Sequence, residues 1–240
     1  MQTSSAEAVL ELWERASACP PQARALVLLA AAGADPAPGS LTVGECEVQL
    51  LALHEAMFGS QLDGFANCPN CGAALELGLD IRDLRAAVAN PSAPQVLDYQ
   101  GYEVHFRVLT GTDLADAARC RTVPEARALL LERAIVLASR EGRTVRPARL
   151  PKAVVERLAE RLAECDPWAE SLLDLNCPEC LHQWTVLLDV AVFIWTELRA
   201  RAQRLQHDVH ALATAYGWRE SDIVAMSSRR REAYLALVGA

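Results

Sequence analysis

Two stretches of the chain alternate apolar and polar residues, one at 75–81 and the other at 184–190. A period of two is typical of a half-buried β-strand, because successive side chains of a strand point to opposite faces. Apolar residues also lie at 62–65 and 173–175, and a Cys-Pro-x-Cys loop separates each of these runs from the alternating stretch that follows. The pattern therefore predicts two β-hairpins, each with a Cys-Pro-x-Cys loop at its tip.

A third hairpin is predicted over 96–99 and 102–108. Apolar residues alternate along its second half, and Gln100-Gly101 between the two halves is typical of a two-residue hairpin turn. Glu141-Gly142 is predicted to turn the chain again.

Most of the remaining chain repeats its apolar residues every three or four positions, which is the spacing of an amphipathic helix. The longest run extends from 191 to 216, and Gly217 is predicted to supply its left-handed cap. Capping residues and prolines indicate where the other helices begin. The predicted starts are Ser4, Gln22, Thr42, Asp83, Thr112, Thr122, Pro151, Asp166, Glu220 and Ser227 or Ser228, and the helix from Thr122 is predicted to run through Val136 and Leu137.

The two loops supply Cys68, Cys71, Cys177 and Cys180, in a spacing typical of zinc knuckles. A separation of two residues lets both sulfurs of one turn lie about 2.3 Å from a common Zn²⁺. Four thiolates complete a tetrahedral site and leave no position for water or substrate, so we predict one structural zinc. His182 is an alternative ligand, but the four cysteines already complete the site.

These elements predict an α+β fold that is predominantly helical and is built around a split four-cysteine zinc ribbon, made of two β-hairpin knuckles. The expected organisation is an N-terminal helical segment at 1–61, the split zinc-ribbon module at 62–81 and 172–190, an inserted β-hairpin and helical region at 82–171, and a C-terminal amphipathic helix with an Arg-rich helical tail at 191–240.

Composition narrows the class of protein. The 240 residues are 52% hydrophobic, which is enough to bury a core in one or two domains, and the net charge of −8 argues against a whole surface that binds nucleic acid. The first residues lack the basic and apolar regions of a signal peptide, and no apolar window is long enough to span a membrane. Together with eight cysteines, this predicts a cytoplasmic protein without membrane contact.

Two catalytic interpretations of the cysteines are weaker than the structural one. A thioredoxin-type pair lies at the start of a helix after a strand, whereas alternating stretches follow both loops here. A deaminase zinc site has its proline before the first cysteine, whereas here each proline lies inside the loop. Sequence patterns of zinc proteases, serine hydrolases, P-loops and dinucleotide sites are not found. We therefore predict no enzyme, no catalytic or cofactor-binding residue and no small-molecule substrate.

The C-terminal tail concentrates basic residues in an otherwise acidic chain: Arg219, Arg229, Arg230 and Arg231, with Tyr234 beside them. Such a run is either a solvated polar face or a docking surface for an acidic protein partner, and less readily for phosphates. The tail lacks the interleaved aromatic residues that are typical of single-strand binders. These five residues are the candidate partner contacts.

The tail from 209 to 235, with its Tyr-Gly-Trp and Arg-Arg-Arg-x-x-Tyr sequences, resembles the C-terminal segment of baseplate hub-assembly proteins of T-even-type contractile phages. Related proteins occur in phage-tail-like contractile injection systems. Segments 53–72 and 174–180, which include both cysteine loops, are similar to zinc-knuckle members of this group. Residues 1–45 and 85–150 match only in outline.

This resemblance implies a non-enzymatic structural or assembly protein of a contractile-tail baseplate, either resident in the particle or acting during assembly in the cytoplasm. Its expected partners are other baseplate, hub, wedge or tail proteins. The alternative, from a different class, is a zinc-ribbon module that binds nucleic acid or acts in transcription.

Overall fold

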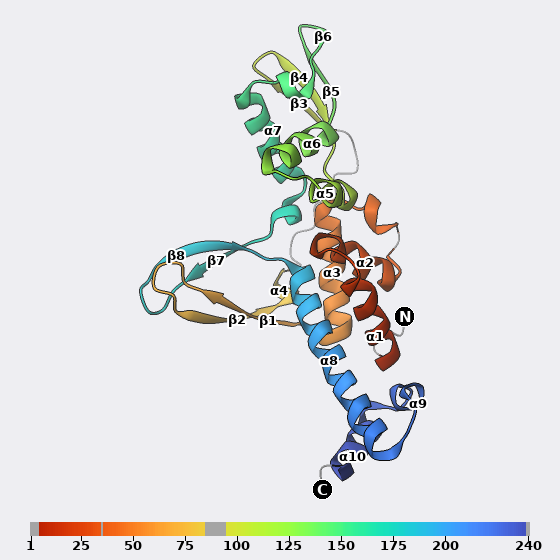
Figure 1. Ribbon diagram of the computed structural model, residues 1–240. Coiled ribbons are helices and arrows are strands. Elements are labelled where there is room, and N and C mark those ends of the chain that lie inside the picture. The colour runs from red at the N-terminus through yellow and green to blue at the C-terminus, as the bar shows by residue number, and fades with distance from the viewer. Residues whose placement is uncertain (1–4, 35, 85–94, 239–240) are drawn as a thin grey trace.

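The computed structural model describes residues 5–34, 36–84 and 95–238, and it shows a mixed α+β chain, mainly helical, with small antiparallel sheets. The molecule is elongated (Figure 1). A group of helices forms its middle, a four-stranded sheet with its helices lies at one end, and two short helices of the C-terminal tail lie at the other. None of the described helices is long and apolar enough to cross a membrane.

The middle of the molecule contains four helices that share one hydrophobic core. They are α1 (Ala6–Ser17), α2 (Arg24–Ala32), α3 (Val43–Phe58) and α8 (Val190–Tyr216). Short 3₁₀ turns at Pro21–Ala23 and Pro38–Ser40 precede α2 and α3. Leu28, Leu50 and Ile194 are fully buried where the helices meet. The apolar stripe that predicted α8 therefore packs against the N-terminal helices.

Local sequence determines where these helices begin and end. Ser5 caps α1, and the predicted capping box of α3 is present, with Thr42 and Glu45 each accepting a backbone N–H of the other. Gly33 and Gly217 adopt the left-handed conformation after α2 and α8. A glycine has no Cβ, so it takes this conformation without steric cost and ends the helix.

Two hairpins extend sideways from these helices (Figure 1). Strands β1 (Gln61–Asn67) and β2 (Ala74–Asp80) form the first, and β7 (Leu172–Asn176) and β8 (Gln183–Leu187) form the second. Each is a two-stranded antiparallel sheet, and side chains alternate between more and less buried along every strand. The predicted hairpins are thus present, and we call the two together the arm, residues 61–80 and 172–187.

The inserted region between the hairpins has a core of its own. It contains an antiparallel sheet in the order β3 (Gln95–Tyr99), β4 (Tyr102–Phe106), β5 (Ile135–Arg140) and β6 (Arg143–Thr144). Helices α5 (Gly111–Ala117), α6 (Val123–Ala134) and α7 (Lys152–Cys165) accompany the sheet, with a 3₁₀ turn at Pro147–Arg149. Phe106, Val104 and Leu158 are fully buried between the sheet and α7. The predicted third hairpin is β3–β4.

The helix predicted from Thr122 ends earlier than expected. It stops at Ala134, and Val136 and Leu137 belong to strand β5, which pairs with β4. The apolar spacing of this stretch suits either structure, and in the sheet Ile135 and Ala138 are buried in the core of the inserted region. The prediction of helix over Val136 and Leu137 was therefore wrong, because tertiary pairing decides an ambiguous apolar run.

Asp166 also has a different role from the one predicted. The short turn Pro167–Glu170 does follow it, but its side chain makes no cap there. Instead its Oδ2 accepts the backbone N–H of Gly44, at 3.0 Å, in the first turn of α3. A single carboxylate thus ties the end of the inserted region to the N-terminal helices across 122 positions of sequence. Burial, the largest cause, raises the pKa of Asp166 above its usual value.

Two further boundaries differ from the predicted ones. Helix α5 begins after Thr110, which forms a capping box with Asp113, so the helix starts before Thr112. The helix expected from Asp83 is observed as α4, Ile81–Leu84, and the rest of that prediction lies outside the described residues.

The tail beyond α8 folds back as α9 (Glu220–Val224) and α10 (Ser228–Val238). Ser227 Oγ accepts the backbone N–H of Arg230, so Ser227 is the cap of α10.

Candidate metal centre

The two cysteine loops have the same backbone hydrogen bonds. In the first, the Cys68 N–H donates to Ala73 O at 2.8 Å and the Gly72 N–H donates to Cys68 O at 2.9 Å. In the second, the Cys177 N–H donates to His182 O and the Leu181 N–H donates to Cys177 O, both at 2.9 Å. These bonds curl each loop into a tight turn, so that both cysteines of a loop present their sulfurs to the same space.

One position distinguishes the loops. Gly72 and Leu181 are equivalent, each four residues after the first cysteine, and both are left-handed, with φ of 76° and 58°. The turn requires this conformation for closure. Glycine adopts it freely, whereas a leucine is strained by about 1–2 kcal/mol.

The structure brings all four predicted cysteines together at the end of the arm. Their Sγ atoms lie within 4.8 Å of one another, and the Cys68–Cys180 and Cys71–Cys177 pairs are 3.6 Å apart. Four sulfurs around a tetrahedral Zn²⁺ at about 2.3 Å are about 3.8 Å apart, so the cluster has nearly the size that a zinc site needs. Among the described residues, this is the group of His, Cys, Asp and Glu side chains positioned to hold a metal ion.

Burial is uneven within the cluster. Cys68 and Cys177, the first cysteine of each loop, are buried, whereas Cys71 is exposed and Cys180 half-buried. The first cysteines therefore face the space between the hairpins, while the second ones close the cluster from the solvent side.

The electrostatics of the cluster favour a bound cation. The Asn70 side-chain amide donates to Cys180 Sγ at 3.4 Å, and this bond, followed by the His182 backbone N–H, lowers the pKa of Cys180 to about 6. At Cys71 the Ala73 N–H acts to lower the pKa, but the neighbouring sulfurs and desolvation together outweigh it and raise the pKa to about 12. Four thiolates at this spacing repel one another, so all four lose their protons together only when a cation lies between them.

His182 does not belong to the cluster. Its ring stacks on the indole of Trp184, with ring centroids 6.0 Å apart, and four sulfurs occupy the ligand positions without it.

A site whose four ligands are all protein sulfurs has no open coordination position. Its chemistry is to hold two segments together rather than to activate water or substrate.

Polar contacts fix the base of the arm to the helices. His54, which is fully buried, lies 2.8 Å from Glu197 Oε1 through Nε2 and 3.1 Å from Gly59 O through Nδ1. Arg201 donates to Met57 O at 3.3 Å. These contacts join the end of α3 to α8 where β1 begins. Sequence patterns do not predict these contacts. Those of His54 with Glu197 and of Arg201 with Met57 join residues more than 140 positions apart, and that of His54 with Gly59 depends on burial.

The structure separates the five tentative contact residues of the tail. Arg219, Arg229 and Arg230 are exposed, and the Arg230 guanidinium lies 5.8 Å from the centre of the Tyr234 ring. Arg231 is only 7% exposed and pairs with Asp208 on α8, at 3.0 Å. Arg231 therefore anchors α10 to α8 and is not accessible to a partner.

The same region contains an aromatic cluster that the sequence pattern did not predict. The rings of Tyr216 and Trp218 stack at 4.6 Å, and Tyr234 meets Trp218 edge-on at 4.8 Å. Tyr216 and Trp218 are two residues apart, but Tyr234 joins them only because α10 folds back along α8. The cluster gives the tail a partly exposed aromatic surface beside Arg230.

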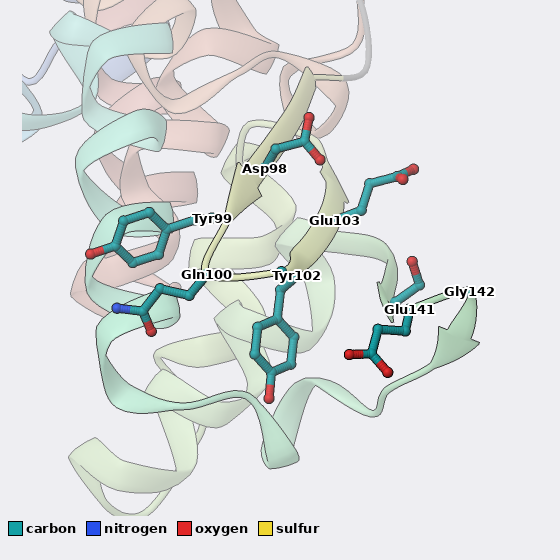
Figure 2. Close-up of a pocket in the computed structure, with 9 residues that line it drawn as sticks. Asp98, Tyr99, Gln100, Tyr102, Glu103, Glu141 and Gly142 are labelled. Atoms are coloured by element: carbon teal, nitrogen blue, oxygen red, sulfur yellow. The ribbon is translucent and has the colours of Figure 1, made fainter.

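A shallow hollow of about 420 Å³ lies at the turns of the β3–β4 and β5–β6 hairpins (Figure 2). Its lining includes the carboxylates of Asp98, Glu103 and Glu141 and the ring of Tyr102. His105 forms an ion pair with Glu103 at 2.6 Å when its ring is protonated. The three carboxylates do not converge closely enough to form a metal group among the described residues.

Comparison with protein-family models gave no match, and comparisons with curated proteins and with solved structures gave none either. The interpretation of the site therefore depends on its own geometry.

Proposed function

We propose that this chain is a non-enzymatic structural or assembly protein whose cysteine cluster binds one structural Zn²⁺. The observation that carries the proposal is the closed set of four sulfurs. They come from two hairpins more than a hundred residues apart, and no ligand position is left for a reacting group. The metal acts as a clamp that fixes the N-terminal helices, the inserted region and α8 in one arrangement.

Elemental analysis of the purified, metal-replete chain tests the clamp. We expect one zinc per chain, lost when Cys71 and Cys180 are both replaced by serine and retained when Cys120, which lies outside the cluster, is replaced. A ratio of two zincs per chain, or none after zinc-replete expression, contradicts the proposal.

We further propose that the neighbours of this protein belong to the baseplate of a contractile phage tail or a contractile injection system. The support is the resemblance of the tail and of both cysteine loops to baseplate hub-assembly proteins. The aromatic cluster of Tyr216, Trp218 and Tyr234, with exposed Arg229 and Arg230, is a surface of the composition that protein interfaces favour.

Co-expression with tail-tube, hub and baseplate-wedge proteins tests this assignment. We expect one of them to co-purify with the chain, and the complex to be lost when Arg229 and Arg230 are replaced by glutamate. The control is Arg15→Glu, which replaces an exposed arginine on α1 and should leave the complex intact. Failure of all three classes to bind would remove the baseplate assignment but not the structural zinc.

The nucleic-acid alternative is disfavoured by the charge of the arm. Residues 61–81 and 166–198 contain no Lys or Arg, so the zinc module has no cation to contact a phosphate. A gel-shift titration with duplex DNA over a range of salt decides between the two. Tight binding that weakens steeply with salt would support the alternative.

A further inference from the structure

A regular series of basic residues begins at the last residue of strand β5. Every third residue from 140 to 152 is basic: Arg140, Arg143, Arg146, Arg149 and Lys152, which we call the basic strip. All five are exposed. Arg146 has extended dihedrals (φ −71°, ψ 142°) and leads into the 3₁₀ turn Pro147–Arg149. Backbone with three residues per turn returns every third side chain to one side, so this spacing favours a common face for the later members.

Most of the strip has no counter-charge. Lys152 pairs with Glu156 at 3.4 Å, and Arg140 donates to the hydroxyl of Tyr102 at 3.2 Å. In the described part of the chain, Arg143, Arg146 and Arg149 have no carboxylate within ion-pair distance. Glu141, at the edge of the hollow in Figure 2, is the acidic residue within this stretch.

Exposed apolar side chains precede the strip along the sheet. Val136 and Leu137, just before Arg140, are 64% and 46% exposed. Leu137 lies in register with His105, which in turn lies in register with the exposed Val96. Successive residues of a strand point to opposite faces, so Val136 shares the face of Arg140, whereas Leu137 and Val96 lie on the other face of the sheet. This end of the molecule therefore presents positive charge with an exposed apolar side chain on the same face of β5.

The arm has the opposite character. It contains no Lys or Arg, and Asp63, Glu76, Asp174 and Glu179 are exposed along it. Exposed apolar residues lie among them: Phe65 is in register with Glu76, and Leu172 is in register with Leu187. A Zn²⁺ held by four thiolates would add a net charge of −2 at its end.

The two surfaces do not meet within one chain. In Figure 1 the β5–β6 hairpin lies at one end of the molecule, whereas the arm projects sideways from the middle. Among the described residues, no arm carboxylate forms an ion pair with the strip. Each surface is therefore available to the other only between two copies.

We propose that the arm of one copy docks on the basic strip of a second copy, so that the chain assembles with itself through an acidic-to-basic contact. The occupant of the strip is the arm because one chain carries both charges, each beside exposed apolar residues that can pack in the contact. Since two different patches meet, the contact is heterologous, and its repetition produces a closed ring or an open filament. This inference does not depend on the baseplate assignment.

Sedimentation velocity of the zinc-loaded full chain, over a concentration series, tests the proposal. We expect species larger than the monomer at an ionic strength of roughly 0.05 M, and at least about tenfold weaker association at roughly 0.5 M, where the screening length is about threefold shorter. A wild-type chain that stays monomeric throughout at low salt overturns the proposal.

Charge reversal identifies the surfaces. The strip variant R143E/R146E/R149E and the arm variant D63K/E76K/D174K should each be monomeric, while an equal mixture of the two should assemble again. The control R15E/R199E/R204E reverses three exposed arginines elsewhere and brings the net charge from −8 to the same −14 as the strip variant, yet it should assemble like wild type. Circular dichroism and zinc content verify that every variant is folded.

Three outcomes contradict the proposal: the control loses association as the strip variant does, the mixture stays monomeric, or either reversal leaves association unchanged. A duplex DNA titration can give a further contradicting outcome. If wild type binds DNA through the strip but does not self-associate, the strip is a phosphate-binding surface and the docking proposal is wrong.

Discussion

At the scale of single residues, the strain in the second cysteine loop has a measurable consequence. Leu181 holds a left-handed conformation that glycine occupies in the equivalent position of the first loop, and its side chain is 74% exposed. Little packing is therefore lost when the side chain is removed. The backbone requirement of the turn, and not the side chain, determines which residue suits this position.

Leu181→Gly should stabilise the zinc-loaded chain. Relief of the strain contributes about 1–2 kcal/mol, and the greater freedom of glycine in the unfolded chain offsets about half of it, leaving a net gain of about 0.5–1 kcal/mol. Thermal unfolding of the zinc-loaded protein measures this. The reciprocal change Gly72→Leu should destabilise, and an unchanged or lower melting temperature for Leu181→Gly would show that the leucine makes a contact worth more than its strain.

Glu47 is the second residue with a distinct energetic role. One of its carboxylate oxygens is buried with no hydrogen-bond partner, and burial, followed by the charge of Asp189, raises the pKa of Glu47 to about 7. The folded state thus favours the protonated form. Ionisation of Glu47 therefore destabilises the folded state. This destabilisation is absent below about pH 4.5, grows between pH 4.5 and 7, and is fully present above pH 7.

Glu47→Gln should therefore stabilise the chain at pH 8, by at most about 3 kcal/mol, and make little difference at pH 5. Because zinc affinity also changes with pH, the quantity to compare is the difference in unfolding free energy between variant and wild type at each pH. Glu11→Gln, at an exposed position of α1, is the control and should show no such dependence. A constant difference between pH 5 and pH 8 would contradict the assigned pKa.

At the scale of elements, the start of α3 depends on a carboxylate from a distant segment. Asp166 is 6% exposed and accepts the Gly44 N–H, one of the backbone donors that a helix start leaves unpaired. No side chain fits at Gly44 without a shift of its neighbours, because a Cβ there would lie 1.9 Å from Asp166 Oδ1. The backbone of helix α3 at Gly44 is therefore in direct contact with the side chain of Asp166, at the end of the inserted region.

Asp166→Ala should lower the free energy of unfolding by about 1–3 kcal/mol, since it leaves a buried N–H without an acceptor. Asp166→Asn keeps an acceptor oxygen and should lose less. Gly44→Ala should also destabilise, although alanine normally favours a helix over glycine by about 0.5–1 kcal/mol. Chemical denaturation measures all three, and stabilisation by Gly44→Ala would show that the close approach is absent.

At the scale of the whole molecule, the cysteine cluster links distant parts of the chain. The sulfurs of Cys68 and Cys180 are separated by 112 positions, and closing an unstructured loop of that length costs about 4 kcal/mol of entropy. In the proposed metal site, Zn²⁺ would offset this cost because it would bind the assembled cluster and not the separate loops. The proposal therefore couples the stability of the chain to metal binding.

Removal of the metal should loosen more than the arm. With a chelator, or in Cys177→Ser, we expect faster hydrogen exchange in both hairpins and in the helices α3 and α8 at their base. Cys120→Ser, outside the cluster, should behave as wild type. Exchange that accelerates in the second hairpin alone would show that the cluster holds only its own loop.

Features that depend on neighbouring residues in sequence could be predicted without the structure. The capping box at Thr42, the stop at Gly217 and the alternation around both cysteine loops are local, because each rests on hydrogen bonds or side-chain direction within a few residues. The two-residue spacing of the cysteines likewise indicates a metal before any fold is known.

Only the tertiary structure decided what those elements meet. Ile135 starts a strand because an edge of β4 is available to it, and Arg231 is buried because Asp208 lies opposite on α8. Asp166 reaches Gly44, and the four sulfurs meet, through contacts that span more than a hundred residues. Local sequence carries the preferences of each segment, whereas burial and pairing depend on partners that the chain supplies from elsewhere.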